Sequence, residues 1–124
     1  MKINIKATNI ELTEAIAEYV DKKISPLDKY IKNEDAVAQV EVGKNTLHHK
    51  NGDVFRAEVH VTGAGLDIYA ASEKEDLYAA IDAVKDEISR NALADKNKRE
   101  TVARKSARYV KDGLKGLNIF KRRS

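Results

Sequence analysis

The side chains that could carry catalysis or bind a metal are few in this sequence, and their spacing suits neither task. His48 and His49 are adjacent in a polar stretch, and His60 falls on the polar side of a predicted strand. No pair has the helical i, i+4 spacing that places two imidazoles on one metal ion. Surface pairing with neighbouring lysines explains the nearest group of carboxylates, Asp82, Asp86 and Glu87. With no cysteine, no phosphate-binding glycine loop and no nucleophile elbow, the sequence predicts no enzyme, no metal and no cofactor.

Basic side chains are the other chemically informative group, and they gather toward one end of the chain. Residues 1–95 hold 12 Lys and Arg against 18 Asp and Glu, whereas residues 96–124 hold 11 against two. The first part is therefore net −6 and the second net +9. Such a basic segment suits a polyanion, either nucleic acid or an anionic membrane surface. A solvated tail that only aids solubility is the simpler alternative.

The elements that must position these groups follow from the spacing of the apolar residues. Period-two alternation predicts four strands, at residues 2–7, 36–43, 53–62 and 65–72. The glycines of Gly63-Ala64-Gly65 permit a tight hairpin between the last two. Apolar residues three and four apart predict a helix that begins near Thr13, its N-cap, and that stops or kinks at Pro26.

A second helix is predicted to begin at Ser72, because Ser72 and Glu75 have the spacing of a capping box. Its buried stripe comprises Leu77, Ile81, Val84 and Ile88, and helix-favouring composition continues to Lys111. The order β-α-β-β-β-α predicts an α+β fold, a four-stranded sheet with two helices packed on one face. We expect residues 1–95 to form this domain and residues 96–124 to form a basic C-terminal extension, partly helical or disordered.

No segment of the chain reads as a membrane span or a secretory signal. The sequence has no apolar run of about 18 residues, and its first residues, Met-Lys-Ile-Asn-Ile-Lys, alternate between apolar and polar side chains. A cytoplasmic protein with one core is the simplest interpretation.

Two segments together resemble the ribosome hibernation-promoting factor and ribosome-associated inhibitor family. Leu12 to Ile24 fits the family pattern "(L/I)T-x-A-(L/I)-x-x-Y-V-x-x-K-(L/I)", and Asp76 to Asp82 fits "D-(M/L)-Y-A-A-I-D". The resemblance covers roughly residues 1–90 and does not reach the tail, which is typical of a short family member. It departs at Pro26 and at Glu87, where the family usually has basic residues.

The resemblance implies a double-stranded RNA-binding-domain-like fold and a translation inhibitor that occupies the decoding region of the small ribosomal subunit. There it would exclude messenger and transfer RNA without any chemistry. The implied partner is the small ribosomal subunit, through ribosomal RNA and ribosomal proteins, with no small-molecule substrate and no membrane, and the free protein would be a monomer. The positions that match basic family residues on the two helices are Lys22, Lys23, Lys29 and Arg90.

The basic residues that follow the second helix could replace the charge that Glu87 removes from it. We hypothesise that they move the phosphate contacts further along the chain: Lys96, Lys98, Arg99, Arg104, Lys105 and Arg108. Two alternatives stay open. One is a general double-stranded RNA-binding module, and the other is a membrane- or partner-docking protein that uses the apolar residues of the tail, with Phe120 inserted and residues 121–123 at the headgroups.

The two family tyrosines have a structural and a functional interpretation. Tyr19 lies in the apolar stripe beside Val20, so we expect it to pack in the core. Tyr78 lies on the shoulder of the second helix, where partial burial with an exposed hydroxyl is the simpler expectation than stacking on a base.

Overall fold

The structure, a computed structural model, describes the backbone of residues 1–45 and 52–123 and the side chains of residues 1–45 and 52–108. Its contacts divide the chain into two units, residues 1–93 and 94–124, and each unit is described by itself. The elements in chain order are β1 (Lys2–Thr8), α1 (Glu14–Ile24), the 3-10 turn η1 (Ser25–Leu27), α2 (Asp28–Ile31), β2 (Val37–Asn45), β3 (Val54–Gly63), β4 (Leu66–Lys74) and α3 (Leu77–Arg123).

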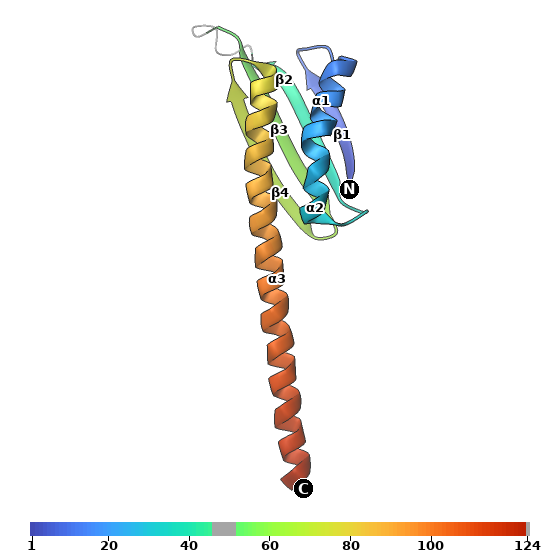
Figure 1. Ribbon diagram of the computed structural model, residues 1–124, viewed down its shortest axis with the longest axis vertical. Coiled ribbons are helices and arrows are strands. Elements are labelled where there is room, and N and C mark those ends of the chain that lie inside the picture. The colour runs from blue at the N-terminus through green and yellow to red at the C-terminus, as the bar shows by residue number, and fades with distance from the viewer. Residues whose placement is uncertain (46–51, 124) are drawn as a thin grey trace. The chain divides into compact units, whose positions relative to one another are not determined.

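The strands form one four-stranded sheet in the order β1-β2-β3-β4 (Figure 1). β1 pairs with β2 in parallel, and β2–β3 and β3–β4 are antiparallel. A parallel pair needs a crossover connection, which α1, η1 and α2 supply. Ala64 and Gly65 connect β3 to β4 as a two-residue hairpin, and both have positive φ, 54° and 82°. The predicted α+β fold with four strands and its hairpin is confirmed.

Local sequence explains where α1 begins and ends. Thr13 is the N-cap, as predicted, and its hydroxyl oxygen accepts a hydrogen bond of 3.2 Å from the backbone N–H of Ile16. Pro26 disfavours a regular helix at the residue before it. The α-helix accordingly ends at Ile24, tightens into η1 and resumes as the single turn α2.

The predicted start of the second helix is wrong. Ser72 lies in β4, opposite Ala57 of β3, and the ladder between these strands continues as far as Lys74. The chain can turn into a helix only after that pairing ends. The carboxylate of Asp76 then accepts a hydrogen bond of 3.0 Å from the backbone N–H of Ala79, so Asp76 is the cap in place of Ser72.

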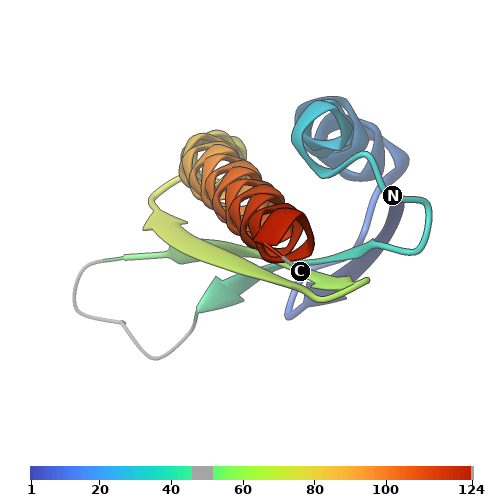
Figure 2. The same ribbon diagram turned by 90° about the horizontal axis from the view of Figure 1, so that it is seen from below.

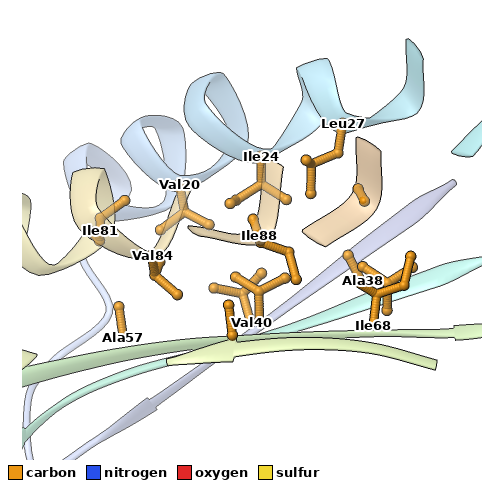
Figure 3. Close-up of a cluster of buried hydrophobic side chains, with 14 of the residues drawn as sticks. Val20, Ile24, Leu27, Ala38, Val40, Ala57, Ile68, Ile81, Val84 and Ile88 are labelled. Atoms are coloured by element: carbon orange, nitrogen blue, oxygen red, sulfur yellow. The ribbon is translucent and has the colours of Figure 1, made fainter. Parts of the chain in front are cut away.

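One face of the sheet carries both helical segments of the first unit, α1 with α2 and residues 77–93 of α3 (Figure 2). Helix residues Val20, Ile24 and Ile88 point down onto sheet residues that include Val40 and Ala38 (Figure 3). All four residues of the predicted stripe in α3 are buried: Leu77, Ile81, Val84 and Ile88. Replacing Ile24, which has no exposed area, by Ala would cost about 2–5 kcal/mol at such a site.

The loop between β2 and β3 and the C-terminal part of α3 are only partly described by the structure. The predicted loop between β2 and β3, with His48 and His49, falls largely outside the described residues. α3 continues to Arg123, beyond the expected end of helix-favouring composition at Lys111. The side chains of residues 120–123, which the membrane-docking alternative placed at the membrane, lie outside the described part. Among the described residues, no helix combines the length and the apolar character that crossing a membrane requires.

Candidate nucleic-acid interface

The helical run of α1, η1 and α2 carries two of the predicted RNA-binding lysines on one flank. Lys22 and Lys29 are both exposed. The chain stays helical from one to the other, and seven residues are about two turns, so the two side chains project to similar sides. The Lys29 ammonium lies 4.9 Å from the centroid of the Tyr30 ring, a cation–π contact. We call Lys22 and Lys29 the basic flank.

A second flank of the same run is acidic. Glu14, Asp21 and Asp28 are exposed and also recur every seven residues. At about 100° per residue, Asp21 points about 100° away from Lys22 around the helix. We call these three residues the acidic flank. The basic flank is not free of acid, because the exposed Glu18 lies one helical turn before Lys22. Charge on α1 is therefore only partly segregated.

The third predicted lysine of this run, Lys23, is held between the two helices by Asp82 of α3. Its ammonium lies 3.3 Å from Asp82 Oδ1, and the Tyr19 hydroxyl donates a hydrogen bond of 2.5 Å to the same oxygen. The Lys23 ammonium also lies 5.4 Å from the centroid of the Tyr19 ring, and the Tyr19 and Tyr78 rings meet edge to face at 4.8 Å. These four residues form a cross-helix cluster.

The cluster explains the pKa shifts of two of its members, Tyr19 and Lys23. The hydrogen bond to Asp82 raises the pKa of Tyr19, and the hydrogen bond to Asp82 also raises the pKa of Lys23. Lys23 therefore stays cationic, but its charge is matched by a neighbouring carboxylate. Tyr19 is half-buried and packs against the hydrophobic core, as expected, with its hydroxyl on Asp82 of α3, and Tyr78 is 39% exposed.

Arg90 and one lysine that sequence reasoning missed complete the cations of α3 within the first unit. Arg90 is exposed, as expected for a phosphate ligand. Lys85 follows Tyr78 by seven residues and Asp82 by three, so it lies on the side of α3 that carries the cross-helix cluster. Its ammonium lies 3.6 Å from Asp86 Oδ1. The sequence already contained a signal for Lys85, because its distance from Tyr78 and Asp82 places it on the same side of the helix as these two motif residues.

The second unit holds the remaining six predicted residues on one helix, where the structure separates them into two groups. Arg99 Nε lies 2.6 Å from Asp95 Oδ2, and Lys96 Nζ lies 3.5 Å from Glu100 Oε1, both as i, i+4 pairs. Lys98, Arg104, Lys105 and Arg108 are exposed, and no ion pair within the described side chains involves them. Two of the six cations are thus neutralised locally.

The sheet face that is free of helices carries a polar network of both signs. Arg56 lies 3.2 Å from Glu58 and 3.4 Å from Glu73, and the Tyr69 hydroxyl donates a 2.8 Å hydrogen bond to Glu58. Burial disfavours the charged form of Glu58, but hydrogen bonds from Tyr69 and Arg56 outweigh it and lower the pKa of this carboxyl.

Two further polar pairs lie on this face. His60 lies 2.6 Å from Asp67, and the Thr8 hydroxyl donates a 2.7 Å hydrogen bond to Glu41. A hollow of about 220 Å³ beside β1, β2 and β3 is lined by members of these pairs, Glu41 among them. No group of three potential metal ligands occurs in the described part of the chain. The face therefore mixes charges of both signs and offers no uniform charge to a polyanion.

Comparison with known proteins places this geometry in a family. Residues 3–100 match the family model described as sigma 54 modulation protein / S30EA ribosomal protein. The chain is 34% identical over 98 residues to the ribosome hibernation promoting factor of Escherichia coli (strain K12). The aligned region covers 79% of this chain and 96% of that protein.

A longer relative and a solved structure give the same result. The ribosome hibernation promotion factor of Lactococcus lactis subsp. cremoris is 33% identical over 95 residues, which cover 73% of this chain and 46% of that protein. The crystal structure of the Thermus thermophilus Protein Y N-terminal domain aligns with this structure at a TM-score of 0.64 and 34% sequence identity. The alignment covers 76% of this chain and 98% of the Thermus chain. This chain belongs to the family of the sigma 54 modulation protein and S30EA ribosomal protein.

Proposed function

We propose that this protein is a ribosome hibernation factor that binds the small ribosomal subunit at its decoding region and keeps messenger and transfer RNA out. Family membership carries the first half of this proposal, because relatives that cover the whole folded domain are named ribosome hibernation promoting factors. In this proposal the protein acts by occupying space, which requires no chemistry.

The distribution of cations supports RNA as the surface that is bound. Lys22 and Lys29 on the basic flank and Arg90 on α3 are exposed cations of the helical layer, and the half-buried Lys85 adds a cation that is paired with Asp86. Ribosomal RNA is recognised through phosphates and shape, which requires cations on a rigid support and little else. Because both helical segments rest on one sheet, their cations keep a fixed spacing.

The acidic flank supports one orientation over others. Glu14, Asp21 and Asp28 would meet phosphate repulsion if the domain approached RNA with that side of α1. Docking through the basic flank turns these carboxylates away from RNA. The cross-helix cluster contributes by keeping the two helices in register, with Lys23 as a link between them and a secondary contact.

The experiment that tests the proposal is co-sedimentation of the protein with purified small subunits across a KCl series, with and without messenger RNA and initiator transfer RNA. We expect saturable binding that weakens steeply with salt and that both RNAs displace. A short RNA duplex serves as a second competitor. If the duplex displaces the protein as effectively as messenger RNA does, the protein is a general duplex-binding module. If neither messenger RNA nor transfer RNA displaces it, binding at the decoding region is rejected.

A further inference from the structure

Residues 94–108, the part of the second unit whose side chains the structure describes, belong to α3, and their charges are not spread evenly around the helix axis. At about 100° per residue, Lys98, Lys105, Arg108 and Arg104 fall within an arc of about 120°. Asp95, Lys96, Arg99 and Glu100 fall on the opposite side. We call the first group the basic ridge and the second the paired side.

The paired side is electrically self-contained. Its two ion pairs, Asp95–Arg99 at 2.6 Å and Lys96–Glu100 at 3.5 Å, match each cation with a carboxylate. Pairs of this spacing stabilise an isolated helix by about 0.2–0.5 kcal/mol each. A phosphate that approached this side would meet Asp95 and Glu100 as well as the two cations, so the net attraction would be small.

The basic ridge has the opposite character. No carboxylate lies on its arc between residues 94 and 108, although Glu100 is close to Arg104 at one edge. Its four cations extend over about 15 Å of helix axis, at 1.5 Å per residue. The polar side chain between them, Thr101, donates a 2.8 Å hydrogen bond to the backbone oxygen of Asn97 and so leaves the ridge unobstructed.

The ridge is also free of the groups that other partners would need. Between residues 94 and 108 the one large apolar side chain, Val102, is 55% exposed and lies about 40° beyond the edge of the arc at Lys98. A membrane anchor inserts an apolar face, and a protein interface is usually centred on aromatic or other large anchors. Lys and Arg without such anchors suit a phosphodiester backbone, to which guanidinium groups bind with two donors.

We infer that the basic ridge of Lys98, Arg104, Lys105 and Arg108 is an RNA-backbone contact surface, and that Lys96 and Arg99 are internal helix-stabilising residues that do not contact RNA. This inference rests on the proposed function, since it divides the cations of the extension between two roles. It assigns the partner of the ridge as ribosomal RNA phosphate, bound without base recognition.

Two double variants of the full chain test the division, because each removes two positive charges. Lys98→Gln/Lys105→Gln removes two of the four cations of the ridge, and Lys96→Gln/Arg99→Gln removes the cations of the paired side. Gln has a helix propensity close to those of Lys and Arg, so the backbone should be retained, which circular dichroism checks. The probes are small subunits and protein-free small-subunit ribosomal RNA, each across a KCl series.

For the ridge variant we expect binding to both probes to weaken about tenfold near 0.15 M KCl, with a log–log salt slope shallower by about 1.5, the value for two lost phosphate contacts. The paired-side variant should change affinity by less than about threefold and leave the slope nearly unchanged, because distant charges are screened over about 8 Å. Equal losses in the two variants would refute the division. Unchanged binding of the ridge variant would refute the surface itself.

Two further measurements keep this inference separate from the proposed function. Displacement of the wild-type protein by messenger and transfer RNA tests the decoding region and needs no ridge variant, so it can fail while the ridge result stands. Vesicles of phosphatidylglycerol and phosphatidylcholine test a membrane. If the ridge variant lost vesicle binding but kept its affinity for both RNA probes, the partner of the ridge would be a membrane and the inference would be wrong.

Discussion

Gly43 provides the sharpest structural test of how closely β1 and β2 approach each other in the sheet. It lies in β2, opposite Thr8 in the parallel register with β1. A Cβ atom added at Gly43 would lie 2.5 Å from the carbonyl oxygen of Thr8, far inside the roughly 3.5 Å of favourable contact. The obstructing atom belongs to the backbone and cannot rotate away, so β1 and β2 would have to separate. We therefore expect Gly43→Ala to lower the free energy of unfolding by about 1–3 kcal/mol, the usual cost of overpacking.

Urea denaturation at 25 °C measures this loss, and Gly65→Ala gives a control with a different cause. Gly65 has a φ of +82° but nothing within 4 Å of an added Cβ, so Ala there costs about 1–2 kcal/mol through backbone strain alone. The two variants should differ in where NMR shifts change: at Thr8 and its neighbours for Gly43→Ala, within the β3–β4 hairpin for Gly65→Ala. A Gly43→Ala protein within about 0.5 kcal/mol of wild type would show that the close approach of β1 and β2 does not limit stability.

Two further predictions concern the charged flanks and the sheet face. Lys22→Gln/Lys29→Gln should weaken small-subunit binding about tenfold near 0.15 M KCl, while Glu14→Gln/Asp21→Asn should not weaken it, and equal losses in a sedimentation assay would contradict the orientation proposed for the domain. Glu58 has a folded-state pKa below its ordinary value of 4.5, so the stability it contributes is present above that pH and lost as the pH falls through the folded value. Glu58→Gln should therefore flatten the decline of unfolding free energy below pH 4.5, and an unchanged acid profile would exclude a role for this network.

The sequence was most informative where structure is set locally. Thr13 and Pro26 delimit α1 because capping and the missing proline N–H act within a few residues. The alternation of apolar residues identified all four strands within two residues of their observed ends. The family motif at Asp76 to Asp82 also lies where the structure starts a helix, although the cap is Asp76 itself.

The failures come from interactions between distant parts of the chain. Ser72 and Glu75 have the spacing of a capping box, but pairing of β4 with β3 holds Ser72 in a strand. Tyr19 belongs to an apolar stripe in the sequence, yet its hydroxyl reaches Asp82 of α3, 63 residues away. The same carboxylate pairs with Lys23, so one of the predicted RNA ligands is also a bridge between helices. Periodicity along one helix contains no information about the partner that another helix brings.

Net charge is a poor guide to what this domain binds, and its surface explains why. Residues 1–95 are net −6, which taken alone argues against a phosphate-rich partner. Charges interact strongly over only about 8 Å at physiological salt, however, so binding depends on the cations at the contact and not on the sum over the chain. Lys22 and Lys29 lie on a flank that Asp21 and Asp28 do not share. Under the proposed function, the acidic flank opposes misdirected docking, and the exposed cations of the basic flank, of α3 and of the basic ridge supply the attraction. The salt slope should then count those cations and not the net charge.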